Sequence, residues 1–234
     1  MTPPPPARSP LTLLRLLQLS NATLPVGAYS YSEGIETLVE QGRITTAAQL
    51  QDWLTQELRY GGIRLEAAIA VRAYHSTQAA NWEQVRYWQA WWGATRDTAE
   101  LYQQSLAMGQ ALTRLLPALD PTIAPLLTEI EGTETGCHYA IALGLTAAHW
   151  QFDLSEFIAS YLFSWASNLV NAGVRVIPLG QTAGQQILWS LQDVITTATP
   201  LILTWADDDL TLNGWGAAIA SLQHETLYSR LFRS

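Results

Sequence analysis

Apolar side chains recur at the three-to-four-residue spacing of an α-helix along almost the whole sequence. The pattern is clearest at residues 154–172, where one stripe holds Ile158, Tyr161, Leu162, Trp165, Leu169 and Val170, as in a helix with one buried face. Similar patterns run through about 11–20, 32–40, 46–60, 63–76, 81–95, 98–116, 122–130, 136–151, 181–198 and 214–223. The alternating pattern of β-strands is nearly absent, because the apolar stretch at 200–205 is short and isolated. We therefore predict an all-α fold, a globular multi-helix bundle of about nine or ten helices.

Capping and breaking residues mark several helix ends. Thr46, followed three residues later by Gln49, has the pattern of a capping box at a helix start. Gly61 predicts the end of the same helix. Pro117 predicts the end of the helix that begins near residue 98, because proline lacks the backbone donor that continues a helix.

One helical domain is expected between two dissimilar ends. Residues 1–10 hold five prolines and predict a disordered, extended lead-in without the apolar core of a secretory signal. A single all-helical domain covers 11–223, and 224–234 form a C-terminal tail. No stretch looks like the ~20 consecutive apolar residues of a membrane span. We therefore expect a soluble, cytoplasmic protein.

The composition leaves little charge for the surface. Hydrophobic residues make up 48% of the 234 residues and charged residues 14%, well below the roughly 25% charged content of an ordinary soluble domain. The sequence also holds ten tryptophans, a residue enriched where proteins meet. These proportions predict apolar surface that is covered by other subunits.

The charges disfavour two classes of partner. A net charge of −8 opposes binding to nucleic acid, which needs a basic face, and binding to anionic membrane lipid. All twelve basic residues are arginine. Arginine suits fixed ion pairs and interfaces, although a codon preference of the lineage explains the same fact equally well.

The sequence offers little for catalysis or metal binding. Cys137 is the only cysteine, and Cys137 and His138 point about 100° apart on a helix, so they are expected to be a structural pair. His138 with Glu134 is a weak metal candidate, since two ligands make a weak site.

The three aspartates in 205–210 match no calcium loop and suggest a solvated loop. Surface or core roles are expected for the other histidines, which are His75, His149 and His224. Phosphate-loop, dinucleotide, nucleophile-elbow and zinc-protease motifs are absent from the sequence, so we expect a protein that is not an enzyme.

Three segments point instead to the recognition of other proteins. "LPVGAYSYSEGIE" at 24–36 interrupts the helices with two glycines, a proline and two tyrosines. "VRVIPLGQTAGQQ" at 174–186 joins an arginine to a Pro-Leu-Gly turn and three glutamines. "SRLFRS" at 229–234 is apolar and cationic, although chain ends are usually polar.

These segments, in this order, resemble the urease accessory protein UreF family over nearly the whole chain from Leu11. The resemblance implies an all-helical, non-catalytic homodimer that acts as a scaffold or checkpoint in nickel insertion into apo-urease. It further implies binding to the accessory protein UreD, also called UreH, and recruitment of the nickel-carrying GTPase UreG. Nickel is then handled by the complex, and no cofactor is bound tightly by this chain. Whether the chain stimulates or restrains GTP hydrolysis stays open.

The resemblance also assigns candidate roles to single residues. The tail is expected to be loosely packed in the free chain and to insert apolar anchors into UreD, after which Arg230 holds carbonyl groups of the turn that contains Tyr29. Tyr29, Tyr31, Glu33 and Glu36 are candidates for the surface that UreG reads. The other candidate partner-binding residues are Arg175, Gly180, Gln181, Tyr228, Leu231, Phe232 and Arg233.

Two other functions fit the sequence less well. One is a helical enzyme or binding protein for a small hydrophobic ligand, with the tryptophans of 82–92 lining a pocket. The other is a nickel-storage protein, which the one cysteine and four histidines disfavour.

Overall fold

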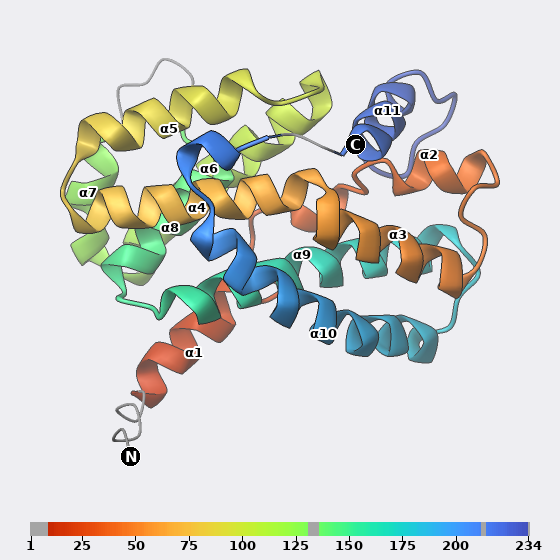
Figure 1. The fold of residues 1–234 in the computed structure, drawn as a ribbon, viewed down its shortest axis with the longest axis horizontal. Coiled ribbons are helices and arrows are strands. Elements are labelled where there is room, and N and C mark those ends of the chain that lie inside the picture. Colours follow the sequence, from red (N-terminus) through yellow and green to blue (C-terminus); the bar gives the residue numbers. More distant parts are fainter. Residues whose placement is uncertain (1–8, 131–135, 212–213, 234) are drawn as a thin grey trace.

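Every regular element of the structure is a helix. The computed structural model describes residues 9–130, 136–211 and 214–233, and in those residues it has eleven α-helices and no strand (Figure 1). The α-helices are α1 (Pro10–Leu19), α2 (Ile35–Glu40), α3 (Ala47–Tyr60), α4 (Gly62–Gln78), α5 (Trp82–Ala94), α6 (Ala99–Leu119), α7 (Ala124–Thr128), α8 (Tyr139–His149), α9 (Leu154–Val176), α10 (Gln181–Thr204) and α11 (Trp215–His224). Three 3₁₀ helices join them, η1 (Ala28–Ser30), η2 (Pro121–Ile123) and η3 (Asp207–Asp209). The predicted all-α fold is confirmed, with slightly more helices than predicted.

The centre of the bundle is the crossing of α4 and α8. Ten successive residues of α8, Tyr139 to Ala148, are buried, and α4 buries a broad face against them. Gly144 allows the close approach, because a side chain there would overlap the carbonyl oxygen of Ala70 and lie 2.7 Å from Cβ of Ala73. The remaining helices surround this pair (Figure 1).

A second layer is formed by α9 and α10, which lie side by side, with α3 packed on α10 (Figure 1). By length and composition alone, α10 could cross a membrane. Of the residues in its most apolar stretch, 39% are buried in the fold. The expectation that no segment reaches such length and apolarity is therefore wrong for α10. In this fold α10 packs one face into the core, with Ile187, Leu191 and Ile202 buried.

Capping side chains mark several helix starts, among them Asn81 before α5, Thr98 before α6 and Asp153 before α9. The Thr46 hydroxyl accepts from the Gln49 backbone N–H at 3.3 Å, as its capping pattern predicts. The expected stop at Pro117 is wrong, since α6 continues to Leu119, and α10 likewise passes through Pro200. Both prolines lie in the last turns, where each removes a single backbone hydrogen bond, and packing of fully buried neighbours such as Leu116 outweighs that loss.

The two ends of the described chain behave differently. Helix α1 projects from the body of the bundle, whereas the C-terminal end lies beside α11 (Figure 1). The N-terminal expectation for 1–10 falls mostly outside the described residues, although Pro10 already belongs to α1.

Candidate functional site

The segment 24–34, here called the glycine loop, contains two glycines in the left-handed backbone conformation. Gly27 has a φ of 80° and precedes η1, and Gly34 has a φ of 85° and precedes α2. Glu33 also has a positive φ, 49°, which is uncommon for a residue with a side chain. The loop can hold this shape because α9, α6 and the C-terminal segment supply the hydrogen bonds described below.

Helix α9 holds the first turn of the loop through two backbone carbonyl groups. The Asn168 Nδ2 atom donates to the carbonyl oxygen of Ala28 at 2.8 Å, and the Arg175 Nη1 atom donates to that of Tyr29 at 3.3 Å. An arginine therefore does reach this turn, but it is Arg175 and not Arg230. The sequence predicts only a partner-binding role for Arg175.

The side chain of Glu33 points inward. One carboxylate oxygen accepts from Gln104 Nε2 at 2.7 Å, and the other accepts from Trp165 Nε1 at 2.9 Å. These bonds tie the loop to α6 and α9. Glu33 therefore anchors the loop, which differs from its expected place on a surface that UreG reads.

The segment 225–233, here called the C-terminal segment, is fastened to the loop and to α2. Glu36 Oε1 accepts from the Leu231 backbone N–H at 2.6 Å, and Glu36 Oε2 accepts from that of Phe232 at 3.0 Å. The Arg233 backbone N–H donates to the Ser30 carbonyl oxygen at 2.8 Å. Phe232 is 5% exposed. We call this set of contacts the clasp; it replaces the loose packing expected for the tail.

A buried histidine lies at the centre of the clasp. His224, the last residue of α11, is fully buried, with Nδ1 2.9 Å from a Glu100 oxygen and Nε2 3.1 Å from Glu36 Oε2. Arg230 Nη1 lies 2.9 Å from the other Glu100 oxygen. Sequence reasoning missed His224 and Glu100, and no local signal could have found them, because they lie 124 positions apart.

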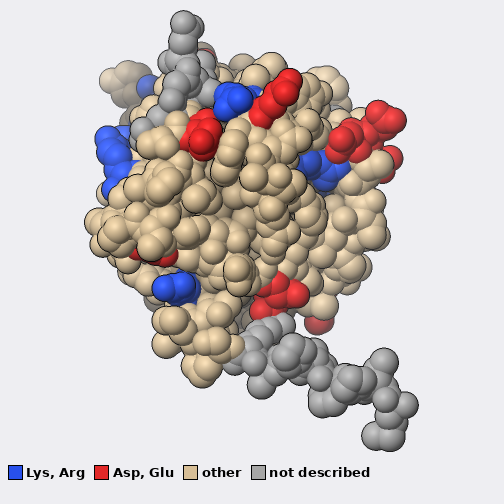
Figure 2. Space-filling view, turned by 90° about the vertical axis from the view of Figure 1, so that its left-hand side faces the viewer, with Lys and Arg blue, Asp and Glu red and all other residues tan. Residues whose placement is uncertain are grey.

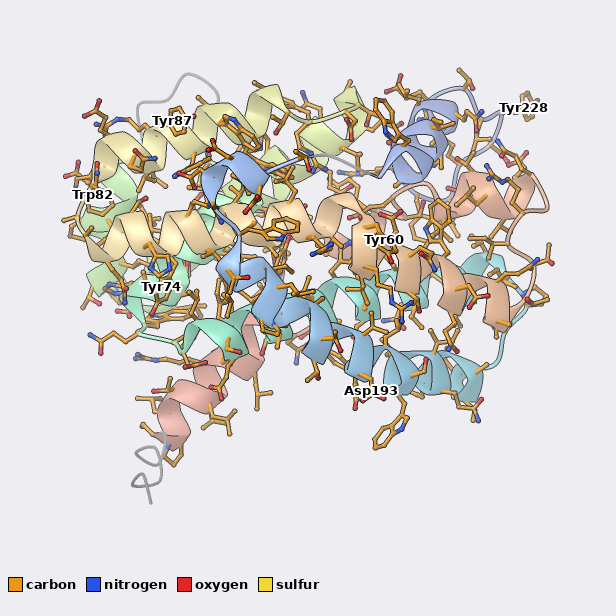
Figure 3. All side chains as sticks on the ribbon, in the orientation of Figure 1. Tyr60, Tyr74, Trp82, Tyr87, Asp193 and Tyr228 are labelled. Carbon is orange, nitrogen blue, oxygen red and sulfur yellow. The ribbon has the colours of Figure 1, made fainter. Side chains whose placement is uncertain are left out.

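The candidate partner-binding residues differ in exposure. Tyr29 is 61% exposed, Leu231 64%, and Tyr228 stands free of the body at the outer edge of the molecule (Figure 3). Tyr31 is buried, contrary to its expected place on a docking surface. Gly180 and Gln181 lie on the exposed connector that begins α10. The glycine loop is held by Asn168 and Arg175 of α9, and not by Gly180 or Gln181.

Two small cavities lie beneath the loop, each about 40 Å³ and large enough for only a few water molecules. They share Glu33, Glu66, Arg96 and Trp165. Burial raises the pKa of the Glu66 carboxyl, and Arg96, 3.8 Å away, opposes that effect. Burial, and then the nearby Glu33 carboxylate, raise the pKa of Glu57 to about 7.

Replacing Glu57 with glutamine should stabilise the protein at alkaline pH. A carboxyl whose folded pKa exceeds its unfolded value binds a proton on folding, so its native state loses stability as pH rises from about 4.5 to about 7. Glu57→Gln removes this loss. Urea unfolding should show the variant to be more stable than the parent at pH 8, with the difference shrinking towards pH 5. A stability difference that is constant with pH would show that burial does not raise the pKa of Glu57 in the folded protein. The control is Glu83→Gln, which changes an exposed glutamate in the first turn of α5.

Cys137 and His138 are both buried and precede α8, so the helical geometry expected for this pair is wrong. Burial raises the pKa of the Cys137 thiol to about 12, and burial with the nearby Arg96 lowers the pKa of His138 to about 4. His138 Nδ1 lies 3.0 Å from the Ser105 hydroxyl. Glu134, its proposed metal partner, falls outside the described residues. Within the described part of the chain, no group of three or more His, Cys, Asp or Glu could hold a metal ion.

The acidic segment and the tryptophan-rich helix also have structural roles. Asp207, Asp208 and Asp209 are exposed, as a solvated segment would have them, and Arg72 lies 3.1 Å from the Asp207 carboxylate, which ties η3 to α4. Trp88 and Trp92 of α5 are buried, and Trp92 Nε1 donates to the Ser105 hydroxyl. These tryptophans fill the core and do not line either cavity beneath the loop.

Comparison with known proteins places these features in context. The family model described as UreF matches residues 44–192. A protein of Nostoc sp. named urease accessory protein UreF is 51% identical over 94% of this chain and 95% of its own length. Proteins of the same name from Microcystis aeruginosa and Alkalilimnicola ehrlichii are 50% and 39% identical, over 95% and 94% of this chain and 97% and 95% of their own lengths.

Proposed function

Because the chain belongs to the UreF family of urease accessory proteins, we propose that it is a non-catalytic scaffold for nickel insertion into apo-urease. In this role it binds UreD, also called UreH, and recruits the nickel-carrying GTPase UreG in the cytoplasm. Nickel is cargo of the whole complex, and this chain needs no cofactor of its own.

The clasp is the observation that carries this proposal. It joins the glycine loop and the C-terminal segment into one continuous surface, in which Glu36 and Phe232 are inner anchors while Tyr29, Tyr228 and Leu231 remain outside. Exposed aromatic groups on a rigid support bind partners with little loss of conformational entropy. The surface is therefore prepared to bind a protein.

The C-terminal half of this surface suits UreD. Trp215, Ile219 and Leu222 of α11 are 75%, 47% and 51% exposed, and their i, i+4, i+7 spacing puts them on one helix face. Tyr228 and Leu231 lie in the segment that follows α11. Apolar side chains at these spacings are the pattern of a helix that docks in a groove. We assign this face to UreD and Tyr29 to UreG.

A homodimer would cover a different apolar surface. Leu11, Leu14 and Leu17 of the projecting α1 are each more than half exposed. At the base of α1 lies an uncharged hollow of about 520 Å³, lined in part by Leu17, Phe163 and Ile195. The left-hand side of the molecule in Figure 1 carries its charged side chains mostly near its margins (Figure 2). We assign subunit contact to the α1 region, separate from the clasp.

Co-purification with UreD and UreG tests the proposal. The intact chain should bring down both proteins, and a chain ending at His224 should bring down neither, because it lacks the clasp. Tyr29→Ala should keep UreD and lose UreG, whereas Tyr228→Ala should weaken UreD. Tyr87→Ala, at the opposite end of the molecule (Figure 3), is the matched control. Failure of the intact chain to bind either protein, or full binding by the truncated chain, would refute this function.

A further inference from the structure

The ring of His224 connects both carboxylates that hold the C-terminal segment. Glu36 binds that segment through the backbone N–H groups of Leu231 and Phe232, and Glu100 binds it through Arg230. His224 lies between these carboxylates, with one ring nitrogen within hydrogen-bond distance of each. Both of these hydrogen-bond contacts therefore join the ring to carboxylates that fasten the C-terminal segment.

This geometry requires a proton beyond those of a neutral imidazole. A neutral ring has one N–H donor and one bare nitrogen, which is an acceptor. A bare nitrogen 2.9 or 3.1 Å from a carboxylate oxygen would place two acceptors together in a fully buried position, where unpaired polar groups are costly. A second ring proton removes the conflict, because an imidazolium donates from both nitrogens.

The neighbouring groups favour that proton on the ring. Glu36 accepts two backbone amides and Glu100 accepts a guanidinium N–H, and such bonds favour ionised carboxylates over carboxylic acids. The charged groups that face the ring are thus Glu36 from α2, Glu100 from α6 and, behind Glu100, Arg230. With His224 charged, these four groups sum to zero; with a neutral ring they carry an uncompensated negative charge.

Beside them is an open hollow of about 540 Å³ between α6 and the segment, and it supplies further titratable groups. It is lined in part by Tyr31, Glu225 and Arg233 as well as Glu100 and Arg230. Their side chains face this hollow. The carboxylates within hydrogen-bond distance of the His224 ring are those of Glu36 and Glu100.

We propose that His224 positions the C-terminal segment as a doubly protonated bridge, so that closure of the clasp is coupled to the uptake of one proton. Opening exposes the ring to water and releases its proton once the pH exceeds the range in which a solvated histidine is charged. The clasp is therefore most stable at acidic pH and weakens as pH rises. This proposal concerns the chain alone and does not depend on the proposed function.

Hydrogen exchange of the intact protein between pH 5.5 and 8.5 tests the coupling. Protection factors of the Leu231 and Phe232 amides, corrected for intrinsic exchange, should fall by up to about tenfold per pH unit, the slope for one linked proton. His224→Gln, which cannot donate from two ring positions, should give lower protection without this slope. His149→Gln is the control, because that side chain lies outside the clasp and should keep the parent's pH profile.

Ring ¹⁵N chemical shifts of His224 in the unaltered protein give a second test, which holds even if His224→Gln fails to fold. Both ring nitrogens should carry protons wherever the two amides are protected. A neutral ring with protected amides, or protection factors that stay constant across this pH range in the parent, would overturn the proposal.

Discussion

Glu36→Gln is expected to open the clasp while leaving the helical bundle folded. Glutamine keeps the shape of glutamate but has only one acceptor oxygen. If that oxygen faces the Leu231 N–H, the amide nitrogen faces the donors of Phe232 and His224. Breaking a buried charged pair in this way costs on the order of 3 kcal/mol. The segment should therefore open about a hundred times more often.

Limited proteolysis and exchange would measure this opening. Trypsin should cleave after Arg230 and Arg233 about a hundredfold faster in Glu36→Gln than in the parent, and the Leu231 and Phe232 amides should lose protection to the same degree. Glu40→Gln changes an exposed glutamate of the same helix and should have no effect. Equal cleavage of Glu36→Gln and the parent would mean that Glu36 does not hold the segment.

Gly144→Ala is expected to destabilise the whole bundle. The added methyl group would overlap the Ala70 carbonyl oxygen and lie 2.7 Å from Ala73 Cβ and 3.0 Å from the Tyr74 backbone nitrogen. Most of these atoms are backbone of α4, so the helices must separate, and overpacking typically costs about 1–3 kcal/mol or more. The better helix propensity of alanine returns up to about 1 kcal/mol. A net loss of about 2 kcal/mol should lower Tm by roughly 4–8 °C.

Thermal and urea unfolding of two glycine variants would isolate the effect of the crossing. Gly180→Ala makes the same chemical change at an exposed residue with no atom within 4 Å of the added methyl group. Its cost should stay below about 1 kcal/mol, the preference of an N-cap for glycine over alanine. Equal stability of Gly144→Ala and Gly180→Ala would show that α4 and α8 can separate freely.

The helices were predictable where local chemistry decides them. Apolar spacing located α9, and the hydroxyl of Thr46 located the start of α3. The sequence misled at Pro117, because the cost of a proline in a last turn is small beside the packing of the residues around it. That packing depends on distant helices and leaves no local mark.

The candidate site was only half predictable for a similar reason. The glycines and tyrosines of 24–34 and the unusual tail predict two functional segments, but the polarity of Glu33, Glu36 and Tyr31 suggests exposure. The structure buries or anchors all three, because Gln104, Trp165 and the tail amides come from elements far along the chain. The residue that joins these parts, His224, looks like any isolated histidine.

The separation of the clasp residues along the chain also sets the order in which they can meet. Glu36 and Leu231 are 195 positions apart, so during synthesis the glycine loop emerges long before the segment that fixes it. Domains fold largely as their chain emerges, and a contact of such long range closes late. A chain interrupted before Leu231, or one whose α11 has not docked, cannot display the clasped loop. The clasped loop is therefore present only in molecules whose C-terminal segment has been synthesised and docked.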